Sequence, residues 1–284
     1  MRLHLYTRSY IKSDGHINLN PNLVHSIGNL LDKGCGKITW NLLISNTDCI
    51  DYTIYKSDLG IQSVYLDIDY VGPMLSASEA RYKILYRIYN NILATGRQGV
   101  NGENDILMNI DSDDDLINPD KLLTLVNSLT GYEFDLLAFG IKSTPSPNEF
   151  DSWSFTESKF KQDRRYCTLD TQTMFLFMNS CKYIPEMVHR ILRPKSDPSE
   201  SCEDTRMAVN LAKINAGTKN NIRVSAVCSD FIEYRIHQDQ VSKTQDVESK
   251  KLVGSELTKA GNLFVNHKFY KFEGNELIEY SPYN

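Results

Sequence analysis

Apolar and polar residues follow two periods in the first half of the chain, one typical of strands and one typical of helices. Short apolar runs predict strands at residues 2–7, 38–45 and 63–68. After the first and third runs, apolar residues recur at every third or fourth position, which predicts helices that begin at Asn20-Pro21 and at Ser76. Proline in the first helical turn, and serine with a glutamate three residues later, are typical helix starts. Strands that alternate with helices predict an α/β protein, a three-layer α/β/α sandwich with a mostly parallel central sheet.

A fourth predicted strand, residues 105–110, is followed at once by a cluster of four carboxylates: Asp111, Asp113, Asp114 and Asp115. The next helix begins directly afterwards, at Asn118-Pro119. Ligands of parallel sheets bind at the carboxyl ends of the strands. The position of this cluster, as well as its charge, therefore indicates a functional site.

The second half of the chain has a less regular pattern. It predicts a helix at residues 204–216 and strands at residues 134–139, 171–178, 223–227 and 231–236. Residues 262–280 are typical of a hairpin that turns at Gly274-Asn275. We therefore expect one domain over residues 1–243 and a C-terminal appendage with a β-hairpin over residues 244–284.

Composition and charge narrow the class of protein. The 284 residues include 41% hydrophobic and 24% charged side chains, as in ordinary globular proteins, which excludes disordered and fibrous classes. The net charge of −5 gives no overall attraction to nucleic acid or to an anionic membrane. No apolar run is long enough to span a bilayer and no signal segment opens the chain, so we expect a soluble, cytoplasmic protein. The six cysteines include no Cys-x-x-Cys pair, which argues against a zinc cluster or a dithiol redox site.

Four clustered carboxylates repel one another unless a cation lies between them, and a hard divalent metal is the simplest partner. A solvated acidic turn is the alternative, although this cluster lies between a buried strand and a proline-started helix. Asp111, Asp113 and Asp115 also match the first ligands of an EF-hand. Leu116 and Leu122, however, stand where that loop needs glycine and glutamate. A two-metal phosphoesterase or a nucleotidyltransferase would also place carboxylates at a strand end, and this alternative stays open.

Several motifs follow one another along the chain. Residues 108–121 contain Asp111-Ser112-Asp113, Cys202-Glu203-Asp204 stands at a predicted helix start, and residues 234–242 begin with Tyr-Arg-Ile-His. In this order they resemble the Asp-x-Asp segment, the Glu-Asp motif and the closing Tyr-Arg-x-His segment of glycosyltransferase family 2. Residues 76–82 are similar to the helix start that contributes a basic residue to the donor diphosphate in that family. The resemblance extends over roughly residues 1–243.

The resemblance implies a GT-A fold and the transfer of a sugar from a nucleotide-sugar. A UDP-sugar is the default expectation, with Mn²⁺ or Mg²⁺ as the divalent cation. Asp113 would bind the metal, and Asp111 would bind the metal or the donor ribose. Arg235 and His237 would contact the diphosphate from the other side, and His237 is also a candidate metal ligand. Without the resemblance, Arg235 and His237 are better explained as polar residues on one face of a surface strand.

Further donor contacts follow from the same resemblance. Arg81 would contact the diphosphate. Thr7, Ser9 and Asp48, at the ends of the first two strands, are candidates for binding the nucleotide base. The Asp48 carboxylate suits a hydrogen bond from a uracil edge, but a turn cap explains this residue equally well.

The Glu-Asp motif implies the catalytic base. Asp204 would take the proton from the acceptor hydroxyl in an inverting transfer, with Glu203 bracing the site or contacting the acceptor. Because both carboxylates begin a predicted helix, helix capping is the structural alternative.

The acceptor is expected to bind between the metal motif and this pair. Residues 159–195 hold eight basic side chains against three acidic ones. This balance favours an anionic acceptor, such as a phosphate-bearing glycan, a lipid-linked sugar or a modified nucleic acid with a hydroxylated base. A solvated face is the alternative. For the chain as a whole, a nucleotidyltransferase and a catalytically silent nucleotide-sugar-binding module stay open as other functions.

Overall fold

Strand β1 (Arg2–Tyr10) lies inside a ten-stranded sheet and has parallel neighbours on both sides. The computed structural model of the chain describes residues 2–12, 14–45, 59–61, 63–70, 75–94, 105–129, 134–144, 174–177, 203–217, 221–235 and 247–281. Both faces of the sheet are buried around β1, because Leu3 and Leu5 belong to one apolar core and Tyr6 belongs to another.

The sheet is mostly parallel, as expected. Six described strands run in the same direction as β1: β2 (Ile38–Ser45), β3 (Leu66–Tyr70), β4 (Asp105–Asn109), β6 (Leu136–Thr144), β8 (Ile222–Arg235) and β9 (Phe264–Glu273). Three run the opposite way: β5 (Asp115–Leu116), β7 (Met174–Phe177) and β10 (Glu276–Tyr280). The strand order is β10-β9-β8-β6-β7-β4-β1-β2-β3, and β5 pairs with β8.

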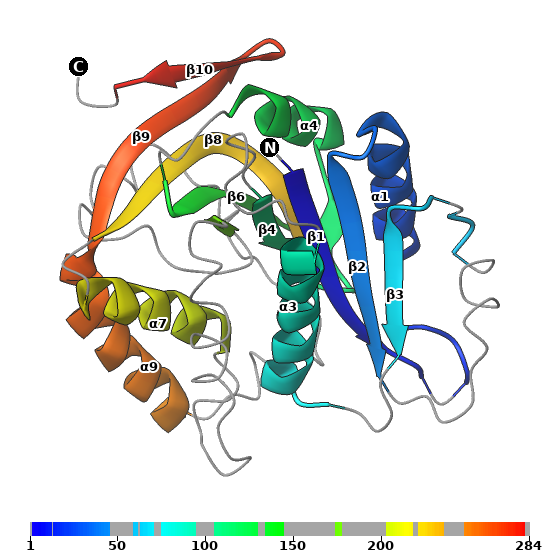
Figure 1. Cartoon of the computed structure of the whole chain (residues 1–284), viewed down its shortest axis with the longest axis horizontal. Coiled ribbons are helices and arrows are strands. Elements are labelled where there is room, and N and C mark those ends of the chain that lie inside the picture. Colours follow the sequence, from blue (N-terminus) through cyan, green and yellow to red (C-terminus); the bar gives the residue numbers. More distant parts are fainter. Residues whose placement is uncertain are drawn as a thin grey trace.

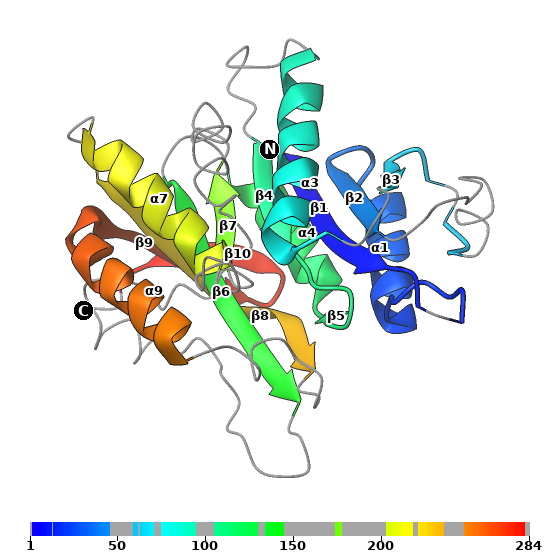
Figure 2. The same cartoon turned by 90° about the horizontal axis from the view of Figure 1, so that it is seen from below.

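Helices cover both faces of the sheet (Figure 1 and Figure 2). On one face, α1 (Pro21–Lys33) and α4 (Pro119–Ser128) pack their leucines into the same core as Leu3 and Trp40. On the other face, α3 (Ala77–Ala94), α7 (Glu203–Gly217) and α9 (Val247–Ala260) share a second core with Tyr6 and Leu107. The predicted three-layer α/β/α sandwich is therefore confirmed.

The helix starts follow the sequence signals. Asn20 caps α1, because its side-chain oxygen accepts a 3.0 Å hydrogen bond from the Asn22 N–H. At α3, the Glu79 N–H donates to Ser76 Oγ over 3.3 Å, and the Ser76 N–H donates to Glu79 Oε2 over 3.1 Å. This reciprocal pair is the predicted capping box.

Strand β8 differs from the prediction, because it is one continuous strand where the pattern indicated two. Phe139 of β6 pairs with Val227, and Gly140 pairs with Asp230, so residues 228 and 229 have no opposite residue on β6. This irregularity is a β-bulge, which takes up the polar residues between the two apolar runs without ending the strand.

The C-terminal segment extends the main sheet. Its predicted hairpin is confirmed: β9 and β10 pair antiparallel, and Gly274 has the positive φ of +63° that the turn requires. Strand β9 pairs parallel with β8, and α9, which the pattern did not predict, packs beside α7. A domain boundary at residue 243 stays a prediction. Strands β9 and β10, which follow this residue, belong to the same sheet as β1.

Within the described residues, no helix combines the length and the apolar character needed to cross a membrane.

Candidate active site

Four parallel strands, β1, β2, β4 and β8, end at the same edge of the sheet. Strand β4 stops beside the middle of β1, and the Ile110 N–H donates to the Tyr6 carbonyl over 3.1 Å. The chain then turns through residues 111–115, which we call the acidic turn, and returns as β5 beside the end of β8. The acidic turn therefore lies at the carboxyl edge of the parallel sheet, where its order in the sequence predicted it.

Asp111 and Asp113 are half-buried members of the acidic turn. The Asn109 side-chain amide donates to Asp111 Oδ1 over 2.9 Å, and the Asp114 N–H donates to the Asp111 carbonyl over 3.2 Å. Both carboxylates lie close enough to Asp114 for their charges to act on it.

Asp114 is the buried member, with 1% of its surface exposed. Its Oδ1 accepts a 3.3 Å hydrogen bond from the Arg235 N–H, whereas its Oδ2 has no hydrogen-bond partner. Burial is the main cause that raises the pKa of Asp114 well above its usual range, and the charges of Asp111 and Asp113 add to this effect. A buried carboxylate oxygen that has no hydrogen-bond partner and lies near other negative charges is stabilised by binding a cation or a proton.

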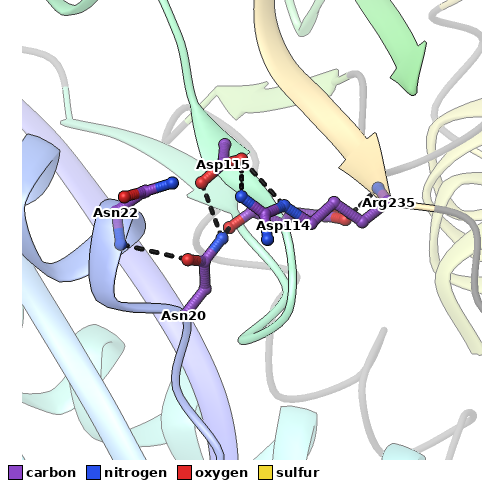
Figure 3. A network of polar contacts seen from close by, with 5 residues as sticks. All are labelled: Asn20, Asn22, Asp114, Asp115 and Arg235. Carbon is purple, nitrogen blue, oxygen red and sulfur yellow. Dashed lines mark hydrogen bonds and ion pairs between the residues drawn. The ribbon is translucent and has the colours of Figure 1, made fainter.

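Asp115 is held on both sides by other elements (Figure 3). Its Oδ2 accepts from Arg235 Nε at 2.8 Å and from Arg235 Nη2 at 2.5 Å. Its Oδ1 accepts from Asn20 Nδ2 at 2.6 Å. Asp115 thus ties the acidic turn to the end of β8 and to the start of α1.

Arg235 lies at the end of β8, beside the acidic turn, as the sequence predicted. The described structure shows it bound to Asp115, with 44% of its side chain exposed. Contact between Arg235 and a donor diphosphate stays a prediction.

Thr7 and Ser9 lie in the interior rather than on the surface of this edge, with 0% and 5% of their surfaces exposed. Thr7 Oγ1 accepts from the Trp40 indole N–H at 3.0 Å, and Ser9 Oγ donates to the Asn18 carbonyl at 2.8 Å. Their predicted contact with the nucleotide base stays untested, and the hydrogen bonds they make here stabilise β1.

Arg81 is a buried arginine near the start of α3, with 2% of its surface exposed. Strand β3 ends at Tyr70, and α3 begins at Ala77, so this helix starts close to the carboxyl edge. The predicted diphosphate contact of Arg81 is compatible with that position and stays a prediction.

Glu203 and Asp204 begin α7, as predicted. Helix α7 ends at Gly217, close to the amino edge, because β8 starts there at Ile222. The start of α7 therefore lies toward the carboxyl edge (Figure 2). The backbone thus brings the Glu-Asp pair toward the same edge of the sheet as the acidic turn. Asp48, His237 and the basic residues 159–195 lie outside the described residues.

Asn20 is the residue of this site that sequence analysis identified only as a helix start. Its side chain reaches the acidic turn from α1, although 94 and 95 residues separate it from its two partners there. The only local signal was the Asn-Pro pair, which is explained by capping alone.

The acidic turn fits a hard divalent cation. Asp111 and Asp113 supply carboxylate oxygens, and the unpaired Asp114 Oδ2 lies in the same turn. Among the residues that the structure describes, no group of three His, Cys, Asp or Glu side chains is assembled as a complete metal site. Such a group is not required, since Mg²⁺-like ions are commonly held by one or two carboxylates together with substrate phosphates.

Comparison with known proteins gives structural matches only. No protein-family model matches the sequence, and no curated protein matches it. The chain is similar to the crystal structure of S. aureus TarS 1–349, with 14% identity and a TM-score of 0.49. It is also similar to TarS 1–349 in complex with UDP, with 11% identity and a TM-score of 0.47. Each match covers 90% of this chain, which spans only 65% of the TarS chain.

A third similar structure is that of a 4-diphosphocytidyl-2C-methyl-D-erythritol synthase. The match has 12% identity and a TM-score of 0.41, and it covers 89% of this chain and 98% of the synthase. Likenesses at this level of identity establish neither a shared activity nor shared site residues.

Proposed function

We propose that this chain is a GT-A-type glycosyltransferase, which transfers a sugar from a nucleotide-diphosphate sugar to an acceptor hydroxyl. The observation that carries the proposal is the acidic turn at the carboxyl edge of the parallel sheet. Asp111 and Asp113 lie half-buried in this turn, beside the buried Asp114, and Asp115 is bound to Arg235 and Asn20. The order of the motifs along the chain supports the same function.

The acidic turn would hold the divalent cation, Mn²⁺ or Mg²⁺, through Asp113 and Asp111. The cation supplies positive charge to the diphosphate as the bond to the sugar breaks. His237 is proposed as a further ligand.

The basic side chains of the donor site are proposed to neutralise the same diphosphate. Arg81 is a buried residue near the start of α3, and Arg235 lies beside the acidic turn. The nucleotide base is proposed to bind at the ends of β1 and β2, with Asp48 as an acceptor of a hydrogen bond from the base and with Thr7 and Ser9 as further candidate contacts. This arrangement makes UDP-sugars the first donors to test.

In the reaction, the acceptor oxygen attacks the anomeric carbon and forms the new glycosidic bond. The bond from that carbon to the phosphate oxygen breaks, and the nucleoside diphosphate leaves with the electron pair. Asp204 takes the proton of the acceptor hydroxyl, as a general base on the face opposite the leaving group, so the transfer inverts the anomeric configuration. Glu203 is the neighbour of Asp204 on α7, and adjacent positions of an α-helix lie about 100° apart around its axis, so Glu203 would support the site or contact the acceptor.

The acceptor is proposed to be anionic, because residues 159–195 are rich in lysine and arginine. Phosphate-bearing glycans, lipid-linked sugars and nucleic acid with a hydroxylated base all present a hydroxyl beside negative charge. Binding of such an acceptor should weaken as salt is added, since salt screens the attraction.

The test is to incubate the purified chain with a panel of nucleotide-sugars and Mn²⁺, with and without these acceptors, and to analyse the products. A glycosyltransferase releases nucleoside diphosphate and yields a glycosylated acceptor. Release of pyrophosphate from a nucleoside triphosphate and a sugar phosphate would instead show a nucleotidyltransferase. Binding of a nucleotide-sugar without any product, across the whole panel, would show a catalytically silent module.

A further inference from the structure

Asn20 makes an unusual number of contacts for a helix cap. It is nearly buried, with 9% of its surface exposed, and each of its polar groups is used. Its carbonyl accepts from the Val24 N–H at 3.1 Å, and its Oδ1 accepts from the Asn22 N–H at 3.0 Å. These two bonds begin α1, and they are two of the five hydrogen bonds that Asn20 makes to described residues.

The other three hydrogen bonds of Asn20 are donated to the acidic turn (Figure 3). The Asn20 N–H donates to the Ser112 carbonyl at 2.8 Å. Its side-chain amide donates one proton to the Asp114 carbonyl at 2.9 Å and the other to Asp115 Oδ1 at 2.6 Å. Three of the five residues of the acidic turn are therefore held by one residue of another element.

We propose that the side-chain amide of Asn20 is a positioning group that sets the acidic turn for binding a divalent cation. This inference rests on the proposed function, in which that cation accompanies the donor diphosphate. By holding Ser112, Asp114 and Asp115, Asn20 sets the backbone that carries Asp111 and Asp113. Groups that orient metal ligands from outside the coordination sphere change metal affinity by about 10–100-fold when they are removed.

The residue type supports this role. Asn, Asp and Ser are nearly equivalent as helix caps, so capping alone does not require the amide. An aspartate at this position would place an anionic oxygen 2.6 Å from Asp115 Oδ1, where Asn20 now donates a proton. Serine would cap the helix but is too short to reach Asp115. Only asparagine caps α1 and also donates two hydrogen bonds to the turn.

Two substitutions separate the capping of α1 from the positioning of the acidic turn. Asn20→Ser keeps the cap and removes the two amide donors, whereas Asn20→Ala removes both functions. Asp135→Ala is the matched control, because it removes a buried residue that accepts from the Arg223 N–H at 2.9 Å, at the amino edge of the sheet and far from the acidic turn. Binding of Mn²⁺ is measured by electron paramagnetic resonance of the free ion, alone and with UDP, and thermal unfolding is followed in parallel.

Both Asn20 variants are expected to bind Mn²⁺ about 10–100-fold more weakly than the wild type, while Asp135→Ala binds it normally despite its lower stability. Asn20→Ala should also unfold at a lower temperature than Asn20→Ser, since only alanine loses the cap. The inference is overturned if Asn20→Ser binds Mn²⁺ like the wild type, if only Asn20→Ala binds weakly, or if Asp135→Ala binds equally weakly. If the wild type itself binds no Mn²⁺ with UDP, cation dependence of the proposed function fails first, and the role of Asn20 fails with it.

Discussion

Asp113 is the proposed direct ligand of the divalent cation. We expect that Asp113→Ala abolishes the effect of Mn²⁺ on nucleotide binding, because the proposed ligand of the cation is lost at a half-buried position. Calorimetric titration of UDP, in Mn²⁺ and in EDTA, measures this effect. Asp120→Ala is the matched control, since Asp120 is an exposed carboxylate on α4 that pairs with Lys33. Wild-type affinity for UDP that is the same in Mn²⁺ and in EDTA would contradict the cation site.

Asp114 should make the stability of the protein depend on pH. Burial, and then the charges of Asp111 and Asp113, raise the pKa of Asp114 well above its ordinary value of 3.8. The folded protein therefore binds this proton more tightly than the unfolded chain. Its contribution to stability is complete below the unfolded pKa and is lost as the pH rises through the folded pKa.

Asp114→Asn removes this titration, because asparagine is uncharged at every pH. We expect the melting temperature of the variant, relative to the wild type, to rise as the pH increases from the ordinary pKa of 3.8 through the raised pKa of Asp114, measured in EDTA. Asp120→Asn, at an exposed position, should show no such trend. A variant that loses stability relative to the wild type as the pH rises would show that the charged form of Asp114 is the stabilising one.

Asp204 is expected to act through catalysis and not through stability. Asp204→Asn should lower turnover by roughly 100-fold or more, as when a general base is removed, with little effect on the binding of UDP and Mn²⁺. Helix capping predicts the opposite result, which is lower stability with nearly normal turnover of the folded protein. Glu203→Gln is the comparison variant. Normal turnover in Asp204→Asn, together with an inactive Glu203→Gln, would show that Glu203 and not Asp204 is the general base.

The start of α3 shows what a local signal contributes at the scale of an element. Ser76 and Glu79 form a reciprocal capping box, and each bonds the backbone N–H of the other. We expect that Ser76→Ala lowers the free energy of unfolding by about 1 kcal/mol, measured by urea denaturation. Ser255→Ala in α9 is the control, because the Ser255 hydroxyl is exposed and bonds only within its own helix, to the Leu252 carbonyl. An equal effect of both substitutions would mean that the capping box adds no stability.

The remaining elements differ in how far their own sequences specify them. Strand β2 and the start of α1 could be predicted because apolar period and capping residues act over a few neighbours. Helix α9 could not, since Gly254 disfavours a helix and its neighbours form no clear apolar stripe. Strand β5 has two residues, too few for any period, and exists because Leu116 pairs with Ile232 of β8.

At the scale of the whole molecule, the C-terminal segment should be needed for the stability of the sheet. Phe269 of β9 is 3% exposed, pairs with Ala226 of β8 and packs edge-on against Tyr280. We expect that Phe269→Ala destabilises the entire protein by about 3–5 kcal/mol, as for other buried phenylalanines. A single unfolding transition that moves as a whole, followed by circular dichroism, would show this coupling.

Val265→Ala provides the comparison on the same strand, because Val265 is 41% exposed and its truncation should be nearly neutral. If Phe269→Ala instead melts only a minor part of the structure, the segment after residue 243 is an appendage that unfolds by itself.

The sequence by itself determined most of the elements in the first half of this protein and the place of its acidic turn. Periodicity and capping are local, and a strand followed at once by carboxylates must carry them to the carboxyl edge of a parallel sheet. It also determined which residues are charged, but not which of the four aspartates is available to a ligand.

The tertiary structure decided how the four carboxylates differ. Asp114 is buried and accepts a hydrogen bond from the Arg235 N–H, 121 residues away. Asp115 accepts hydrogen bonds from Arg235, 120 residues away, and from Asn20, 95 residues away. No local pattern encodes partners at such separations, because they meet only when β1, β4 and β8 take their places in the same sheet. Chemically equal side chains thus become a buried acid, a structural brace and two candidate cation ligands, because burial and hydrogen bonding depend on neighbours that only the fold supplies.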